Sequence, residues 1–279
     1  MFLKMCIADR ISPYTDAVFT SYANHNATSL IVAAVLFSFQ LYADFAGYSD
    51  MAIGVSRIMG IRVAENFRRP YFTQNISEFW RYWHMTLTTW ITNYVFMPLN
   101  IAFRNWDKWG LYAAMLLNTV IIGAWHGANW TFIVFGLYHG LIMVVISMLE
   151  KRRKKLEKEH GLKKKDWYKY SRMTLTFVLW TISLVLFKSN SLTDVCGFFR
   201  QMGSGFGPLF TNESLSVFTF GLLSIFILML KEWGDENKKN WRFLHHRKAW
   251  VRLTTIVLLI FYIVYTGELA GGQFIYFKF

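Results

Sequence analysis

The chain has 279 residues, of which 54% are hydrophobic and only 17% are charged, whereas a soluble domain usually carries about 25% charged residues. Its formal net charge of +13 would suit a nucleic-acid-binding protein, but the basic residues gather in loops between apolar stretches, which argues against that class. The two cysteines, Cys6 and Cys196, lie far apart in unlike contexts, so the sequence predicts neither a disulfide framework nor a metal site.

Long uncharged stretches divide the chain. The longest covers the 41 residues 109–149, and shorter ones cover 17–43, 173–187, 214–230 and 253–267. A bilayer core about 30 Å thick asks for roughly 20 mostly apolar residues per helical span, so we interpret these stretches as membrane helices, some of them short, tilted or re-entrant. The sequence therefore predicts an all-α polytopic transmembrane protein. We expect a single membrane domain over residues 1–279, because no linker or repeat interrupts it.

The basic residues alternate between rich and poor loops. Eleven Lys and Arg lie in 151–172 and seven in 231–252, against two in 188–212 and one after Thr266. By the positive-inside rule, the basic loop 151–172 and the loop 231–252 are cytoplasmic, and 188–212 and the C-terminus are extracytoplasmic. The basic runs also favour anionic lipid head groups.

Two carboxylates follow the first expected span. That span covers roughly residues 30–43 and runs into a segment that carries Asp44 and Asp50 beside small residues. Carboxylates at membrane depth are costly and normally face a protein interior or a water-filled cavity, so both are candidate site residues. The alternative is that they lie at the membrane interface and cap a helix.

An arginine-bearing stretch comes next and ends at Pro70, which discourages helix at the residue before it. A helix is then expected with Ser77 as its N-cap and Glu78 in its first turn. The densely aromatic segment 79–90, which holds His84, suits the membrane–water interface or a helix that lines a cavity.

The stretch 109–149 can hold two passes, and Gly123–Asn129 is its natural turn. Both ends are expected on the cytoplasmic side, because Glu150 leads into the basic loop. The arm 109–122 rises only about 21 Å at 1.5 Å per helical residue, less than the hydrocarbon thickness. We therefore expect His126 to lie recessed below the outer surface, where irregular backbone must be surrounded by protein or a cavity.

The turn carries groups that suit acyl transfer. The imidazole of His126 can take a proton from an alcohol. The amide of Asn129, the indole N–H of Trp125 and backbone amides near Gly127 are candidate donors to an oxyanion. On spacing alone, however, a histidine in a membrane turn is as often structural.

Similarity to a known family is carried by four segments in chain order, 44–54, 65–67, 79–87 and 123–132, together with the ending 274–279. They resemble the membrane-bound O-acyltransferase family, and within it the bacterial alginate O-acetyltransferase branch. The resemblance implies helices around a central acyl-transfer tunnel that holds no bound cofactor.

The same resemblance implies roles for individual residues. It makes His126 the catalytic histidine and His84 its companion in the tunnel. Asn66, like Asp44 and Asp50, falls in a matching motif. His139 also fits the branch, but it lies thirteen residues after His126, so it points to a different helix face and is expected to be structural.

The resemblance also implies a function. A multi-pass bacterial inner-membrane enzyme would move an acyl group, acetyl, from a cytoplasmic thioester such as acetyl-CoA towards hydroxyls of an extracytoplasmic polysaccharide. A periplasmic or secreted acetyltransferase is the expected partner. Arg68 or Arg69 would meet the phosphates of the donor, with lipid anchoring as the alternative. D-alanyl transfer to teichoic acid, a transporter and a non-catalytic truncated scaffold stay open.

Two departures from the family pattern stand out. The segment 91–94 reads Ile-Thr-Asn-Tyr, where family members usually have an Arg-Asp pair nearby. The start, Cys6–Arg10, resembles a point well inside the family's sequence. The resemblance therefore implies a C-terminal portion that lacks several N-terminal membrane helices.

Overall fold

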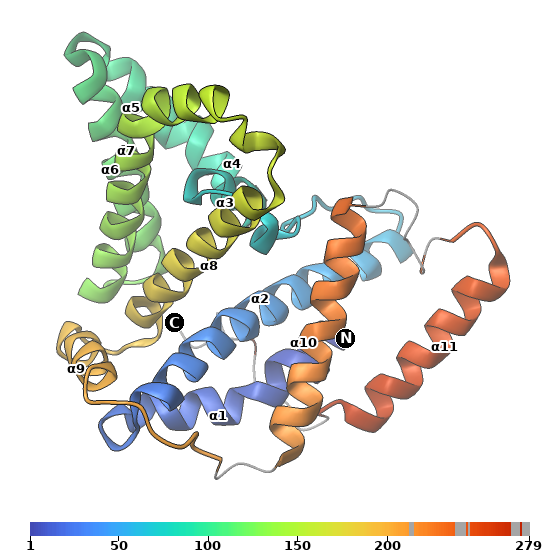
Figure 1. Cartoon of the computed structure of the whole chain (residues 1–279). Coiled ribbons are helices and arrows are strands. Elements are labelled where there is room, and N and C mark those ends of the chain that lie inside the picture. Colours follow the sequence, from blue (N-terminus) through green and yellow to red (C-terminus); the bar gives the residue numbers. More distant parts are fainter. Residues whose placement is uncertain (212–214, 238–243, 245, 269–273, 275–279) are drawn as a thin grey trace. The chain divides into compact units, whose positions relative to one another are not determined.

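The computed structural model describes residues 1–211, 215–237, 244, 246–268 and 274, and this part of the chain is built from helices (Figure 1). The all-α prediction is confirmed. The chain divides into two compact units, Met1–Glu65 with Phe198–Phe279, and Asn66–Gly197. The single domain over 1–279 stays a prediction. The resembling residues 275–279, and with them the expected outward C-terminus, lie outside the described residues.

The first unit contains one long helix and several shorter ones. Its elements are η1 (Phe2–Ala8), α1 (Asp9–Thr20), η2 (Tyr22–Asn24), α2 (Ala27–Ile58), α10 (Leu215–Asn237) and α11 (Ala249–Thr266). Helix α2 begins at Asn26, whose side-chain oxygen accepts a hydrogen bond from the backbone N–H of Ser29. It then continues for 32 residues, so Asp44 and Asp50 lie inside it. The alternative that they cap a helix is therefore wrong, and their position relative to the membrane interface stays a prediction.

The second unit begins with short helices and continues with long ones. Its elements are η3 (Pro70–Phe72), α3 (Ile76–Tyr82), α4 (Met85–Ile91), η4 (Thr92–Phe96), α5 (Met97–Ala102), η5 (Arg104–Trp106), α6 (Asp107–His126), α7 (Trp130–Glu159), η6 (Leu162–Lys164), α8 (Asp166–Lys188) and the start of α9 (Leu192–Met202).

Helix α3 starts two residues earlier than the sequence suggested. Asn75 is the N-cap, because its side-chain oxygen accepts from the backbone N–H of Glu78 at 2.9 Å. Glu78 in turn accepts from the backbone N–H of Gln74 at 2.8 Å. The prediction of Ser77 as N-cap is therefore wrong. The Asn side chain satisfies the first-turn donor equally well and stands three residues before an acidic residue, as in a capping box.

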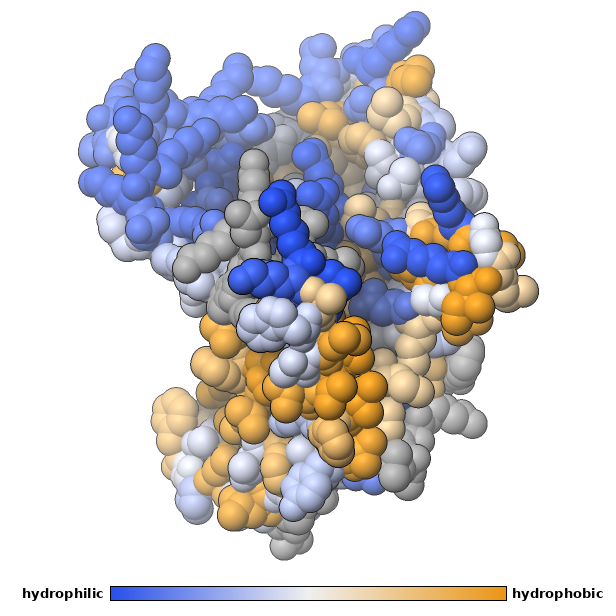
Figure 2. All heavy atoms as spheres, turned by 90° about the vertical axis from the view of Figure 1, so that its right-hand side faces the viewer, coloured by the Kyte–Doolittle hydropathy of each residue, from blue (hydrophilic) through white to orange (hydrophobic). Residues whose placement is uncertain are grey.

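Within the described residues, five helices are long and apolar enough to cross a membrane: Ala27–Ile58, Trp130–Glu159, Asp166–Lys188, Leu215–Asn237 and Ala249–Thr266. Each overlaps one of the uncharged stretches of the sequence. Helix α6 (Asp107–His126), the first of the two passes predicted in 109–149, is not among the five. Figure 2 shows the hydrophobic side chains of the α10 and α11 face as a continuous band with hydrophilic side chains at one end. On α11 large apolar residues such as Phe261 and Val264 are each 69% exposed, as expected of a lipid-facing helix.

Helices α6 and α7 form a hairpin whose turn is shorter than predicted. Helix α6 continues through Gly123 to His126, so the turn contains only residues 127–129. Its 20 residues rise about 30 Å at 1.5 Å per residue. The expected reason for a recessed His126, an arm too short to cross the bilayer core, is therefore wrong.

Glycine allows the two arms of this hairpin to approach closely. A Cβ atom on Gly123 would overlap the carbonyl oxygen of Phe132, and one on Gly136 would overlap the carbonyl oxygen of Thr119. A Cβ on Gly140 would overlap the hydroxyl of Thr119. Small residues at a membrane helix contact let the backbones pack against each other, which partly replaces the missing hydrophobic driving force.

The basic segment 151–172 is mostly helical rather than a loop, because α7 extends into it as far as Glu159 and α8 begins at Asp166. Near the end of α7, the side chain of Glu157 is buried and only 4% exposed. This carboxylate accepts hydrogen bonds from Tyr168 at 2.8 Å and Arg172 at 3.1 Å, and pairs with Lys163 at 3.7 Å. Glu157 thus holds the ends of α7 and α8 together.

We predict that Gly136→Ala destabilises the protein, whereas Gly54→Ala does not. Both glycines lie inside apolar helices, but nothing lies within 4 Å of a Cβ on Gly54. Alanine should therefore be neutral or stabilising at Gly54, because of its higher helix propensity. At Gly136, overpacking should cost about 1–3 kcal/mol. Thermal unfolding of the two purified variants measures this, and equal melting temperatures would contradict the close packing.

Candidate functional site

His84 lies with Trp83 in the two-residue connection between α3 and α4. Its φ of 45° places it in the left-handed region, which is costly for a residue other than glycine. Asn66 compensates for this cost. Its carbonyl accepts from the backbone N–H of Met85 at 2.9 Å. Its side-chain oxygen accepts from the backbone N–H of Thr86 at 3.2 Å and from the Thr86 hydroxyl at 2.7 Å.

The same oxygen determines the tautomer of His84. Because the backbone N–H of Thr86 can only donate, the Asn66 atom that it contacts is the amide oxygen. The Nδ1 atom of His84, 3.3 Å from this oxygen, must then be the donor. Burial lowers the pKa of His84 to about 4, so the ring is neutral near pH 7. A neutral ring that donates from Nδ1 has Nε2 as a hydrogen-bond acceptor.

His126 is the last residue of α6, and its ring packs against aromatic side chains. The centroid distances are 5.0 Å to Phe187, 6.1 Å to Phe132 and 6.2 Å to Phe135. The next residue, Gly127, has φ 157° and ψ 169°, a conformation that is essentially confined to glycine. The glycine of the Trp-His-Gly motif is therefore required by the backbone of this turn.

Trp125 brings the two histidines into one site. Its ring lies 5.9 Å from the ring of His84 and 5.0 Å from that of His126, edge to face in both contacts. The indole is 53% exposed, so one side of this site is open. The pairing of His84 with His126, expected from the resemblance, is thus present in the geometry of one unit.

Asn129 ends the turn that follows His126, and the two arginines follow Asn66 along the chain. The side-chain oxygen of Asn129 caps α7 by accepting from the backbone N–H of Thr131 at 3.1 Å. Its amide nitrogen donates to the carbonyl of Asn190 at 2.7 Å, which leaves one amide hydrogen for a substrate. Arg68 is exposed and Arg69 half-buried, both on the segment that also supplies Asn66.

Asp44 and Asp50 lie in the other unit, on α2, and Asp44 has a clear charge partner. The ammonium of Lys4 lies 2.8 Å from Asp44 and 2.8 Å from Asp9. Burial opposes the charge on Lys4, but its hydrogen bonds to Asp44 and Asp9 outweigh that effect and raise the pKa of Lys4. An acidic residue at membrane depth is thereby neutralised. Its predicted place in a substrate tunnel stays a prediction.

His139 lies in the aromatic core of the second unit. It is fully buried, and its ring contacts those of Phe135 at 4.7 Å and Trp80 at 5.1 Å. Neither of its ring nitrogens has a hydrogen-bond partner among the described residues. Its expected structural role stays a prediction.

Sequence reasoning missed three residues of these environments. Phe187 on α8 covers the His126 ring, and Thr86 shares the Asn66 oxygen with His84. Neither has a sequence signal of its own. Lys4 had one, because a lysine within an apolar run near intramembrane carboxylates is a natural counter-ion. In the described part of the chain, no three His, Cys, Asp or Glu side chains are grouped to hold a metal ion.

Comparison with known proteins adds a family. The sequence model of the membrane-bound O-acyltransferase family matches residues 7–158. The chain is 37% identical over 190 residues to a Pseudomonas syringae protein named probable alginate O-acetylase, which covers 68% of this chain and 34% of that protein. It is 38% identical over 152 residues to the peptidoglycan O-acetyltransferase of Helicobacter pylori, covering 52% and 27%.

A third relative is named for the transfer of D-alanine rather than acetyl. The chain is 34% identical over 172 residues to the teichoic acid D-alanyltransferase of Streptococcus thermophilus, covering 57% of this chain and 41% of the relative. The chain thus spans about a third of the length of the curated relatives that it matches.

We predict that Lys4→Met strongly destabilises the protein. It would leave the carboxylates of Asp44 and Asp9 buried without their shared cation, and breaking a buried pair typically costs about 3–5 kcal/mol. Adding Asp44→Asn should recover part of the loss, because it removes one of the unpaired charges. Melting temperatures measure both effects, with Lys151→Met on the exposed surface of α7 as control. A Lys4→Met protein as stable as the control would refute this role of the pair.

Proposed function

The chain belongs to the membrane-bound O-acyltransferase family, and we propose that it moves an acyl group, acetyl, from a cytoplasmic thioester such as acetyl-CoA towards hydroxyls of an extracytoplasmic polysaccharide. The observation that carries the proposal is the contact of His84 and His126 with the same indole, that of Trp125. Two relatives named for O-acetylation of a glycan support the acetyl group and the class of acceptor.

The proposed reaction is direct transfer between a thioester and an alcohol. The acceptor oxygen bonds to the acyl carbon and the carbon–sulfur bond breaks. The hydroxyl proton passes to the imidazole of His126 and from there to the departing thiolate. The amide of Asn129, the indole N–H of Trp125 and the amides near Gly127 would donate to the oxyanion.

His84 could polarise the acyl carbonyl or hold the attacking hydroxyl, and its tautomer favours the second role. Polarising the acyl carbonyl requires an N–H donor, but Nδ1–H is already bound to Asn66. Nε2, the other ring nitrogen, can only accept. His84 therefore suits holding the attacking hydroxyl by accepting its hydrogen bond, which orients the nucleophile. We assign it this positioning role and keep His126 as the base.

The remaining assignments follow the charge pattern and the family. Arg68 and Arg69, beside the Asn66 segment, would meet the phosphates of the donor on the cytoplasmic side. As a multi-pass protein of the bacterial inner membrane, it would transfer the acyl group to a hydroxyl of a periplasmic or secreted acetyltransferase, which then passes it to the polysaccharide. Asp44 and Asp50 keep their proposed place along the substrate path.

D-alanyl transfer is the second candidate, because a teichoic acid D-alanyltransferase is among the relatives. The two functions use the same nucleophile and base and differ in the acyl group that is delivered. Mass spectrometry of the modified glycan distinguishes them, since an acetyl ester and a D-alanyl ester add different masses.

We predict that His126→Ala abolishes transfer of labelled acetyl to the glycan, because the proton acceptor is lost. General acid–base catalysis typically contributes about 10²–10⁴-fold, so the remaining rate should fall at least a hundredfold. The matched control is His160→Ala, which removes an exposed histidine next to the basic segment. Full acetylation by the His126 variant would eliminate it as the base.

We also predict that Asn66→Asp shifts the acid limb of the pH–rate profile upwards. A carboxylate beside Nδ1–H favours the charged imidazolium, so the pKa of His84 rises from about 4 towards neutrality. Protonation at Nε2 removes the acceptor, and the rate near pH 6 falls while the rate at pH 8 is kept. Asn66→Ala should instead lower the rate at every pH, because the left-handed turn loosens. Identical profiles for Asn66→Asp and the unaltered protein would contradict the assigned role of His84.

A further inference from the structure

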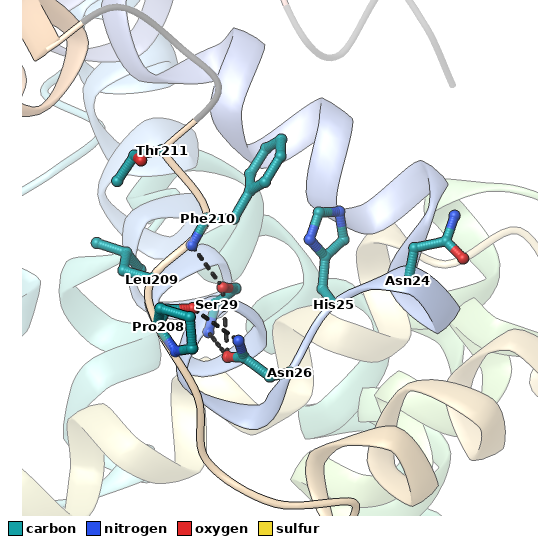
Figure 3. A pocket seen from close by; sticks show the side chains of 8 residues that line it. All are labelled: Asn24, His25, Asn26, Ser29, Pro208, Leu209, Phe210 and Thr211. Atoms are coloured by element: carbon teal, nitrogen blue, oxygen red, sulfur yellow. Dashed lines mark hydrogen bonds between the residues drawn. The ribbon is translucent and has the colours of Figure 1, made fainter.

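A pocket of about 340 Å³ lies in the first unit, between the start of α2 and the segment that precedes α10 (Figure 3). Its volume is at the lower end of the roughly 300–1,000 Å³ of small-molecule sites. The rings of His25 and Phe210 project to the same side of it, with their centroids 4.5 Å apart (Figure 3). Neither the histidine pair nor the proposed reaction uses this pocket.

The walls of the pocket are held together by hydrogen bonds between distant parts of the sequence. The amide of Asn26 donates to the carbonyl of Pro208 at 2.7 Å, and the backbone N–H of Phe210 donates to the hydroxyl of Ser29 at 2.9 Å. The side chain of Gln201 donates to the carbonyl of His25 at 2.9 Å. A pocket that is fixed in this way is preorganised for a ligand.

The lining is polar but uncharged. It offers the side chains of Asn24 and Thr211, the second amide hydrogen of Asn26 and the Nδ1 atom of His25, beside the aromatic ring of Phe210. The Nε2 atom of His25 lies 3.1 Å from the hydroxyl of Ser21. Burial lowers the pKa of His25, so this ring is also neutral near pH 7. Because none of the described residues that line the pocket is a Lys or Arg, a carboxylate there would be desolvated without a counter-charge from them, which is costly. The chemistry suits a ligand that has many hydroxyl or amide groups and an apolar face.

The charge pattern places this pocket on the side where a glycan would be. Its wall from Pro208 to Thr211 belongs to the lysine- and arginine-poor loop 188–212, which the positive-inside rule puts outside. Helix α2 begins at this pocket and ends near Arg57, with Arg62 following, as expected of a helix that runs from the outer to the cytoplasmic side. The loop 188–212 and the direction of α2 therefore both predict that the pocket lies on the outer side.

We propose that this pocket is a subsite for an uncharged pyranose ring of the acceptor polysaccharide, with the apolar face of the sugar against Phe210 and its hydroxyl or N-acetyl groups bound by His25 and the asparagines. The identity of the ligand rests on the proposed transfer to a polysaccharide. The binding itself does not depend on acyl transfer. An N-acetylhexosamine polymer fits the uncharged lining better than a polyuronate.

Binding of two probes to the full chain in lipid nanodiscs tests the proposal. The probes are a tetramer of N-acetylglucosamine and a tetramer of mannuronate, followed by saturation-transfer NMR. The uncharged tetramer should bind and the uronate tetramer should not. His25→Phe keeps a ring against Phe210 but loses both nitrogens, and should weaken binding about tenfold. Thr211→Trp should fill the pocket and abolish binding. The matched control, His160→Phe, should bind normally.

The outcomes separate the subsite from the catalytic proposal. The His126→Ala protein should still bind the uncharged tetramer, so a failed acyl-transfer assay leaves the subsite intact. Folding of each variant is checked by its melting temperature. The proposal is overturned if folded His25→Phe and Thr211→Trp proteins bind as tightly as the control, or if only the uronate tetramer binds. A separate labelling experiment in intact cells tests the predicted side of the membrane. The proposal is also overturned if Asn24→Cys, in a Cys196→Ser background, reacts with impermeant maleimide only after the cells are opened.

Discussion

The close contact of α6 with α7 is the constraint on which the site in the second unit depends. With glycine at 123, 136 and 140, the backbone of one helix lies against the other where any side chain would overlap it. This contact lets a turn of three residues join the two helices. It also sets Phe132 and Phe135 beside His126. A wider hairpin would need a longer turn and would leave the histidine ring without these neighbours.

The opposite wall of the site is held by polar contacts rather than by close packing. His84 occupies a left-handed backbone conformation, and a single asparagine supports it with both its carbonyl and its side-chain oxygen. One residue, Asn66, therefore fixes both the turn and the tautomer. Strained residues of this kind persist where the surrounding structure over-determines them, and they concentrate at functional sites. In the first unit one residue likewise has two partners, because Lys4 forms an ion pair with each of two buried carboxylates.

Much of this architecture could be predicted from the sequence, because charge depletion and basic loops are strong signals in a membrane protein. The uncharged stretches predicted the apolar helices, and the Trp-His-Gly and Trp-His motifs identified the two histidines that meet at Trp125. The errors arose where one residue type serves two purposes. Gly123 looked like a helix breaker, but it is needed for close packing inside α6. Ser77 looked like a cap, but Asn75 supplies the same oxygen two residues earlier. The Asn66–His84 contact depends on a backbone conformation that no local pattern announces.

The central claim is that His84 and His126 take part in one acyl transfer beside Trp125, His84 by orienting the attacking hydroxyl and His126 as the base. The most direct test is an electron cryomicroscopy structure of the protein with an acetyl-CoA analogue whose thioester sulfur is replaced so that transfer cannot occur. The account predicts that the acetyl group lies between Nε2 of His84 and the ring of His126, in contact with the indole. An acetyl group bound away from both histidines would contradict it.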